Sequence, residues 1–178
     1  MLRSAVLFLA LACPTLALAE ATQLPAGSAY EVGFSPSGKS LELVLKAINS
    51  AQSDILVAAY SFTSKPIALA LLEAQHRGVS VMVVADEKDN QKKYSAVTFL
   101  ANSGVAVRLN GNYAIHHHKF MVIDGDSVET GSFNYSEAAV KKNAENALVI
   151  WHAPSLALTY TQEWHRLWDE SAELAPRY

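Results

Sequence analysis

The sequence contains very little cysteine, and Cys13 is the only one among its 178 residues. A single thiol cannot form an intramolecular disulfide, so the stability of the folded chain has to come from packing. The sequence after residue 19 also lacks any apolar run as long as the roughly 20 residues that a membrane-spanning helix needs. It shows no internal repeat, low-complexity tract or linker. We therefore expect one domain, residues 23–178, with no stable membrane association.

The first segment is not expected to belong to that domain. Arg3 precedes an apolar stretch that runs from Ala5 to Leu18 and ends in small residues before Glu20. This order of a basic residue, an apolar stretch and small residues is typical of a secretory signal peptide. We predict a signal peptide over residues 1–19, with cleavage between 19 and 22, and a periplasmic or secreted protein.

The chain also lacks an excess of positive charge, because 14 Lys and Arg residues face 17 Asp and Glu residues, for a formal net charge of −3. Dedicated nucleic-acid-binding domains are more often basic. Any polyanionic substrate must therefore be held by a local positive patch. The pairs Lys92-Lys93 and Lys141-Lys142 are candidates for contacts to a phosphate backbone, although such pairs are ordinarily solvated surface charges.

The spacing of apolar residues predicts alternating helices and strands. Helices are predicted at residues 40–51, 64–77, 94–103 and 154–171. Strands are predicted at residues 54–59, 79–85, 105–109 and 148–151, and an Asp-Gly step predicts a hairpin between 119–123 and 127–130. Because strand, helix and strand in this order favour a parallel pair, we predict an α/β fold. Its sheet should be mixed but largely parallel, with helices on both faces.

Two groups of aromatic residues have more than one interpretation. The last predicted helix carries an apolar face that consists of Ala157, Tyr160, Trp164, Leu167 and Trp168. This face fits the core or a subunit interface better than a ligand site. Tyr60 and Phe62 follow a predicted strand, where ligand-facing residues of α/β folds often lie, but core packing explains them equally well.

The stretch from residue 116 to residue 146 carries the chemistry. If Lys119 opens a strand, the alternation of side chains places His117 and Lys119 on one face and His116 and His118 on the other. An ammonium beside an imidazole repels a metal cation, attracts an anion and favours the neutral, nucleophilic form of the ring. The pair therefore indicates a site for a phosphate, with no metal and no cofactor.

Three further polar residues fit the same site. Ser132 and Asn134 lie two positions apart and supply neutral hydrogen-bond donors, which stabilise charge on phosphoryl oxygens. Glu145 can accept a hydrogen bond from an imidazole and so hold it in the reactive tautomer.

Together these residues resemble the HKD signature of the phospholipase D superfamily. The matching elements are His117-x-Lys119 with Asp124 five residues on, Gly131-Ser132-x-Asn134, and Asn143-x-Glu145. The resemblance implies a single phospholipase D-like domain that hydrolyses phosphodiesters in two steps without a metal.

The same resemblance implies a role for each matching residue. His117 is the nucleophile that forms a phosphohistidine, while a histidine from a second motif protonates the leaving oxygen and later activates water. The phosphate is cradled by Lys119, Ser132 and Asn134, and Glu145 orients His117. Asp124 belongs to the catalytic signature, but its position on the strand has the opposite parity to His117, which favours a structural role.

The chain carries this motif once, whereas the mechanism needs two histidines. We therefore expect a symmetric homodimer with one active site at the two-fold interface. The favoured function is a nonspecific endonuclease acting on DNA, with RNA as a second candidate substrate. The alternatives are a lipid head-group hydrolase, for which no apolar docking segment stands out in the sequence, and a non-enzymatic periplasmic metal or anion carrier that uses the histidine cluster.

Overall fold

The computed structural model of the protein describes residues 21–91 and 95–176. The predicted signal peptide, residues 1–19, and the lysine pair at 92 and 93 lie outside the described residues.

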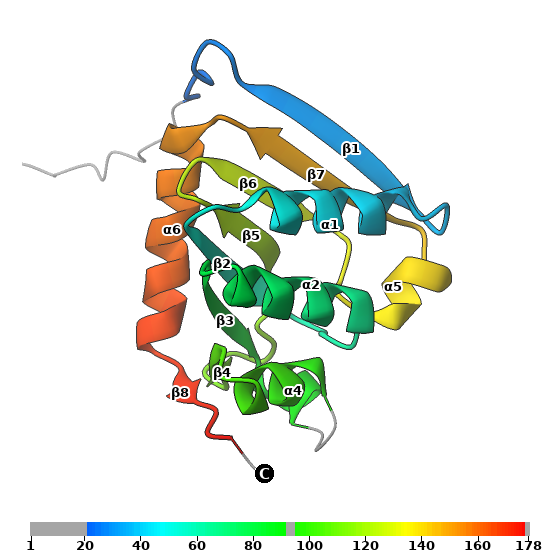
Figure 1. Cartoon of the computed structure of the whole chain (residues 1–178), viewed down its shortest axis with the longest axis vertical. Coiled ribbons are helices and arrows are strands. Elements are labelled where there is room, and N and C mark those ends of the chain that lie inside the picture. The colour runs from blue at the N-terminus through cyan, green and yellow to red at the C-terminus, as the bar shows by residue number, and fades with distance from the viewer. Residues whose placement is uncertain (1–20, 92–94, 177–178) are drawn as a thin grey trace, which may run out of the picture.

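Eight strands form one mixed sheet in the order β1-β7-β6-β5-β2-β3-β4-β8 (Figure 1). In chain order the strands are β1 (Ala29–Ser35), β2 (Asp54–Ala59), β3 (Ser80–Asp86), β4 (Ala106–Asn110), β5 (Lys119–Ile123), β6 (Ser127–Gly131), β7 (Glu145–Trp151) and β8 (Ala172–Glu173). Strand β5 lies in the middle of this sheet, between β2 and β6, and all five of its residues are buried.

The prediction of a largely parallel sheet was wrong. Among the described strands, β3 pairs parallel with β2 and β4, and every other neighbouring pair is antiparallel. The βαβ argument holds where a helix connects neighbouring strands, which is the case from β2 to β4. It does not hold from β5 onward, because the hairpin from β5 to β6 reverses the chain, β7 reverses it again, and β5 itself runs against β2.

Helices cover both faces of the sheet, as the sequence predicted (Figure 1). The larger core lies under α1 (Lys39–Ser50), α2 (Lys65–His76) and α4 (Ala96–Asn102), and the smaller core lies under α6 (Pro154–Asp169). Two short helices, α3 (Glu87–Asn90) and α5 (Glu137–Lys141), follow strands β3 and β6. None of the helices that the structure describes is long and apolar enough to cross a membrane.

The aromatic face of α6 belongs mainly to the core. Trp164 is fully buried and its indole nitrogen donates a hydrogen bond of 2.9 Å to the carbonyl of Val57 in β2. Ala157 and Leu167 are buried beside it, whereas Tyr160 and Trp168 are partly buried. This helix therefore anchors one face of the central strands.

Strand β1 was missed by the sequence analysis, and its inward positions are polar or small. Helix α1 approaches so closely that a Cβ atom on Gly33 would collide with the backbone of Lys39, so this position has to be small. The outward positions carry the apolar side chains instead, and Tyr30, Val32 and Phe34 are exposed at 72%, 45% and 59%. Tyr30, Val32 and Phe34 alternate with Glu31, Gly33 and Ser35, so the segment does carry the period-two pattern of a half-buried strand, which the sequence analysis overlooked.

Candidate active site

The histidine and lysine of the HKD motif lie where β5 begins. Lys119 is the first residue of β5, pairs with Ala59 at the carboxyl end of β2, and is only 8% exposed. His117 is exposed in the loop that precedes the strand. A buried lysine on a central strand is thus placed directly behind an accessible imidazole.

The predicted contact between these two side chains is confirmed. Lys119 Nζ lies 3.1 Å from His117 Nδ1 and donates a hydrogen bond of 2.8 Å to the His117 carbonyl oxygen. Because an ammonium can only donate, Nδ1 is the acceptor in this geometry. Burial lowers the pKa of Lys119 below its ordinary value, and the negative charge of Glu145 partly opposes this shift.

Tyr60 is a site residue that the sequence analysis left undecided. Its ring centroid lies 4.7 Å from that of His117, and Lys119 Nζ lies 5.4 Å from the same tyrosine ring. The amide of Asn90 donates a hydrogen bond of 2.6 Å to the Tyr60 carbonyl, which fixes the backbone just after β2. The Tyr60 ring therefore forms a wall of the site against both His117 and Lys119. Its position just after a predicted strand was the feature of the sequence that pointed to this role.

Ser132 and Glu145 form a second polar pair. The Ser132 hydroxyl donates a hydrogen bond of 2.6 Å to Glu145 Oε2, and Asn143 Nδ2 donates one of 3.0 Å to Oε1 of the same carboxylate. The structure shows no hydrogen bond between Glu145 and His117 of the same chain, within the described residues. Glu145 therefore does not orient His117 within one protomer, contrary to the prediction.

A glycine places Ser132 in this position. Gly131 ends β6 so close to β7 that a Cβ atom would collide with the backbone carbonyl of Asn146. The backbone N–H of Asn146 in turn donates a hydrogen bond of 3.1 Å to the Ser132 hydroxyl. The close approach of the two strands therefore brings Ser132 to Glu145.

Asn134 precedes a tyrosine that is anchored by a buried acid, and this acid gave no signal in the sequence. The Oδ1 atom of Asn134 is buried and has no hydrogen-bond partner among the described residues. The next residue, Tyr135, is fully buried and donates a hydrogen bond of 2.6 Å to Glu129 Oε2. Burial raises the pKa of Glu129 to about 8, although the Tyr135 hydrogen bond opposes this, so the acid is mostly protonated at neutral pH.

The three consecutive histidines turn toward different partners. His116 is buried and its Nδ1 lies 3.3 Å from the Ala59 carbonyl, whereas His118 packs on Phe120 and lies 3.7 Å from Glu163. His117 alone reaches Lys119. In the described ranges no three His, Cys, Asp or Glu side chains are grouped so that they could hold a metal ion.

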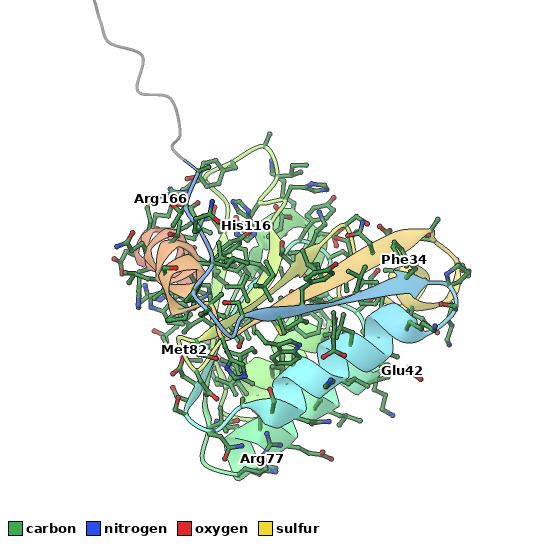
Figure 2. The ribbon with its side chains drawn as sticks, turned by 90° about the horizontal axis from the view of Figure 1, so that it is seen from above. Phe34, Glu42, Arg77, Met82, His116 and Arg166 are labelled. Carbon is green, nitrogen blue, oxygen red and sulfur yellow. The ribbon has the colours of Figure 1, made fainter. Side chains whose placement is uncertain are left out.

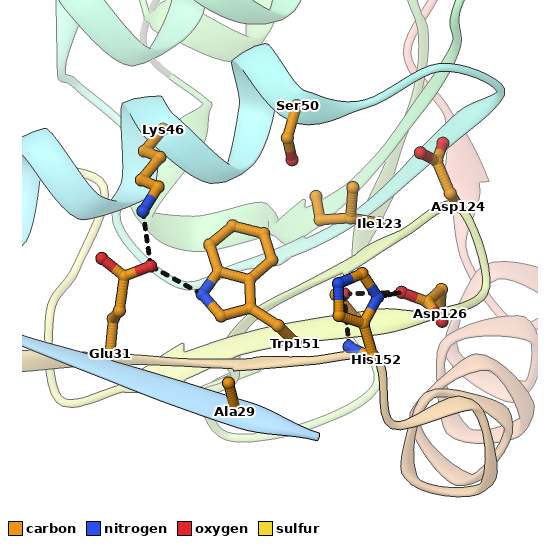
Figure 3. A pocket seen from close by; sticks show the side chains of 10 residues that line it. Ala29, Glu31, Lys46, Ser50, Ile123, Asp124, Asp126, Trp151 and His152 are labelled. Carbon is orange, nitrogen blue, oxygen red and sulfur yellow. Dashed lines mark hydrogen bonds and ion pairs between the residues drawn. The ribbon is translucent and has the colours of Figure 1, made fainter. Parts of the chain in front are cut away.

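Asp124 directly follows the last residue of β5, whereas His117 precedes its first residue. Figure 3 shows Asp124 at the edge of a cavity that lies at this end of the strand. Its carboxylate accepts hydrogen bonds of 2.8–3.1 Å from the backbone N–H groups of Gln52, Ser53 and Asp54. Burial raises the pKa of Asp124, but these amides and the Ser53 hydroxyl outweigh burial and lower it below its ordinary value. The geometry therefore assigns Asp124 to the connection from α1 to β2 and not to the reacting phosphate.

The surface lysines at the end of α5 differ in their surroundings. Lys141 forms an exposed ion pair of 2.6 Å with Glu137, one helical turn earlier. Lys142 is exposed and directly precedes Asn143, whose side chain contacts Glu145. Of the two, Lys142 is the better placed for a substrate that extends beyond the site.

The mixed sheet, the histidine–lysine pair and the serine–glutamate pair on a neighbouring strand define a phospholipase D-like domain. The profile of the family described as "Cardiolipin synthase, PLD-like domain" matches residues 44–168. This chain therefore belongs to the phospholipase D-like family.

Relatives of known sequence support the same assignment. Phospholipase D of Rickettsia bellii is 36% identical over 131 residues, which cover 74% of this chain and 65% of the relative. Mitochondrial cardiolipin hydrolase of Mus musculus is 31% identical over 157 residues, which cover 88% of this chain and 71% of that protein. The chain thus spans less than two thirds of the length of the rickettsial protein.

Solved structures match over most of the chain. Nuc from Salmonella typhimurium, a phospholipase D family member, superposes with a TM-score of 0.81 at 43% identity, covering 83% of this chain and 99% of Nuc. NucT from Helicobacter pylori superposes with a TM-score of 0.76 at 25% identity, again covering 83% of this chain and 99% of the other.

The replacement Asp124→Asn should lower stability without removing activity. Because the pKa of this carboxyl is depressed in the folded state, its stabilising effect is present above the unfolded pKa and is lost as the pH falls through the folded pKa. We expect a loss of about 1–2 kcal/mol at pH 7, discounted for partial exposure, that shrinks below about pH 4. Urea unfolding at several pH values measures this, with Asp126→Asn as a control for a more weakly held acid. A loss of hydrolysis at unchanged stability would instead make Asp124 catalytic.

The replacement Tyr60→Leu should lower the turnover of a phosphodiester because the imidazole loses the wall that positions it. We expect a decrease in kcat on the order of 10- to 100-fold with little change in KM, since a small misplacement of a reacting group has effects of this size. Steady-state hydrolysis of bis(p-nitrophenyl) phosphate measures it. Tyr60→Phe keeps the ring and should stay near the wild-type rate, and equal losses in both variants would contradict a positioning role of the ring.

Proposed function

We propose that this protein is a phosphodiesterase outside the cytoplasm that hydrolyses nucleic acids, DNA foremost and RNA as a second substrate, without sequence specificity. The observation that carries the proposal is the 3.1 Å contact of the buried Lys119 ammonium with the His117 imidazole in a phospholipase D-like fold. This pair offers a nucleophile and a cation to one phosphate.

The reaction has two steps and uses only side chains of the protein. A nitrogen of His117 attacks phosphorus, a P–N bond forms, and the P–O bond to the leaving alcohol breaks while a second histidine gives that oxygen a proton. Water then attacks phosphorus, the second histidine takes the proton of the water, and the P–N bond breaks. Hydrogen bonds from Lys119, Ser132 and Asn134 stabilise the charge on the phosphoryl oxygens, and the scheme uses no metal or cofactor.

A bound phosphate also changes the contacts of Lys119. In the isolated protomer its hydrogens point to a neutral ring nitrogen and a carbonyl. A phosphate oxygen carries negative charge and makes stronger hydrogen bonds with an ammonium than either of these acceptors. Binding of substrate would therefore draw the ammonium away from Nδ1 of His117 and leave that nitrogen free to be protonated and oriented by a carboxylate.

The second histidine has to come from a second copy of the chain, because the motif occurs once. The exposed face of β1 offers a surface for that copy: Tyr30, Val32 and Phe34 project from the side of the sheet opposite α1, next to the partly buried Leu148 and Ile150 of β7. Helix α6 packs on the central strands and leaves this outer part of the face uncovered. Phe34, on the outer strand, is labelled in Figure 2.

This apolar face leads to the candidate site. Phe34 pairs with Asn146, and the next pair in the register is Ser35 with Glu145. A copy seated on the face would therefore lie beside Glu145, whose carboxylate makes no contact with His117 of its own chain within the described residues. In such a dimer Glu145 is free to orient the imidazole of the second copy.

Size and similarity favour a nucleic acid as substrate. The chain covers 99% of the Nuc endonuclease at 43% identity, whereas it covers 65% of the rickettsial phospholipase D. A lipid head group is the second candidate, because the exposed face of Tyr30, Val32 and Phe34 would also suit a membrane surface.

Product analysis on four substrates decides between these functions. With excess EDTA present, we expect cleavage of single-stranded DNA, duplex DNA and RNA, and no release of choline from phosphatidylcholine vesicles. His117→Asn should abolish cleavage because no other group can replace the nucleophile. His152→Asn, a histidine at the far end of the sheet, is the matched control and should leave the rate unchanged.

Each other outcome of that comparison has a definite meaning. Release of choline with intact DNA would establish the lipid hydrolase, and loss of all activity in EDTA would contradict the metal-free mechanism. An absence of hydrolysis on every substrate would favour the carrier.

If one active site is shared by two chains, mixing wild-type with inactive chains should lower the activity with the square of the wild-type fraction. If equal amounts of wild-type and His117→Asn chains are unfolded and reassembled together, about one quarter of the dimers contain two intact histidines. We therefore expect about one quarter of the activity of the same total amount of protein made only of wild-type chains, and about one half would mean independent sites. Phe34→Asp should convert the dimer to a monomer by analytical ultracentrifugation and remove activity with it, whereas Leu69→Asp on α2 should do neither.

A further inference from the structure

Next to the catalytic pair lies a cavity of about 310 Å³ that the phosphate chemistry does not use. The loop between β4 and β5 forms one side with Tyr113, Ile115 and the histidines 116–118, and α6 forms the other with Arg166 and Leu167. His117 lines both this cavity and the phosphate site. A group bonded to the reacting phosphorus can therefore enter the cavity while His117 attacks.

One wall of the cavity is a fixed aromatic ring. Tyr113 is 40% exposed, and its hydroxyl accepts a hydrogen bond of 2.7 Å from Arg166 Nη1. Arg166 is itself held by Glu163 at 2.6 Å and by Glu170 at 3.1 Å. Ile115, which is 47% exposed, adds apolar surface next to the tyrosine. The ring therefore presents a flat surface whose position is set before any ligand binds.

The loop that carries Tyr113 is tied down on both sides of it. Asn112 Nδ2 donates a hydrogen bond of 2.9 Å to the Glu170 carbonyl, and Lys88 Nζ donates one of 3.1 Å to the Ala114 carbonyl. A preformed wall binds a planar group with less loss of conformational freedom than a mobile one.

The charges around the cavity favour a neutral ligand over a charged one. The guanidinium of Arg166 is matched by the carboxylates of Glu163 and Glu170, so little attraction remains for a second phosphate. The same guanidinium lies 5.9 Å from the Tyr113 ring centroid and disfavours a quaternary ammonium there. Burial lowers the pKa of both His116 and His118, so these rings tend to be neutral.

His116 adds one polar group that the protein itself does not satisfy. Its Nδ1 faces the Ala59 carbonyl, which can only accept, so Nδ1 carries the hydrogen and Nε2 is the acceptor. His116 is 2% exposed, and its Nε2 has no hydrogen-bond partner among the described residues. That atom has almost no exposed surface, so in this geometry His116 contributes to the cavity wall and offers no acceptor to a ligand. Figure 2 labels His116 and Arg166, which lie on the same side of the molecule.

We propose that this cavity is the subsite for the nucleobase attached to the scissile phosphate, with the base stacked on Tyr113. The inference rests on the proposed nuclease function and adds to it a contact with the base. Every base has an aromatic face, so a subsite built on stacking accepts all bases.

A single abasic residue in a single-stranded oligonucleotide tests the subsite. Cleavage is mapped at each phosphate of a 5′-labelled strand, and the rate beside the abasic residue is compared with the rate at the same position when the base is present. In the wild-type protein we expect the base to raise the rate about tenfold. Tyr113→Leu should reduce this ratio to near one, while Tyr113→Phe keeps the ring and should keep the ratio. Phe99→Leu, which removes an equally exposed ring on α4, is the control and should also keep it.

The outcomes separate this inference from the proposed function. Equal cleavage with and without the base in the wild-type protein overturns the subsite but leaves the nuclease in place, and it needs no variant. Hydrolysis of methyl p-nitrophenyl phosphate without any cleavage of DNA or RNA overturns the nuclease itself. A change of oligomeric mass in Tyr113→Leu would show that the cavity belongs to the subunit interface, which also overturns the subsite.

Discussion

The site depends on one ammonium that is held almost out of water. A buried charge is costly unless polar groups surround it, and Lys119 has a ring nitrogen, a backbone carbonyl and the charge of Glu145 to satisfy it. The two hydrogen-bond acceptors are neutral, so a phosphate is the partner that would complete the site. The fold supplies what this arrangement needs, because β5 lies between β2 and β6 and is buried along its whole length.

Two glutamates on β6 and β7, Glu129 and Glu145, differ in their surroundings. Glu129 is fully buried, has a pKa of about 8 and holds Tyr135 while it carries a proton. Glu145 is partly exposed and receives hydrogen bonds from Ser132 and Asn143. Because Glu129 is mostly protonated at neutral pH, it anchors Tyr135 without adding a negative charge to the strands that carry the site. Tyr135 directly follows Asn134 in the chain.

The parts of the fold and site that depend only on neighbouring residues in the chain could be predicted from the sequence. The strands from 54 to 59 and from 119 to 123, the Asp-Gly hairpin and the neighbourhood of His117 and Lys119 follow from alternation and turn chemistry, and the structure has them. The sheet direction could not be read in this way, since it depends on which strands pair across long loops. Glu129 gave no signal because a single acid in a short strand is indistinguishable from a surface residue until its neighbours are known.

Strand β1 shows a different limit. Its apolar residues alternate with polar or small ones, which is a strand pattern that the sequence analysis overlooked, and they point outward. Alternation alone does not say whether an apolar face points to the core or to solvent, and here that face is exposed. If the proposed dimer forms on that face, the pattern is that of a core strand whose second layer is supplied by another molecule.

The net negative charge of the chain bears on how such a site could hold a polyanion. Overall charge of −3 does not draw a nucleic acid to the surface, so binding has to come from contacts close to the reacting phosphate. Lys119 supplies one charge there, and Lys142 lies exposed beside the residue that contacts Glu145. If the proposed base subsite is used, stacking there would carry a larger share of the binding free energy than charge does. Stacking does not distinguish strongly between bases, and a site built in this way would combine weak binding, rapid release and little sequence preference, which are the properties of a nonspecific nuclease.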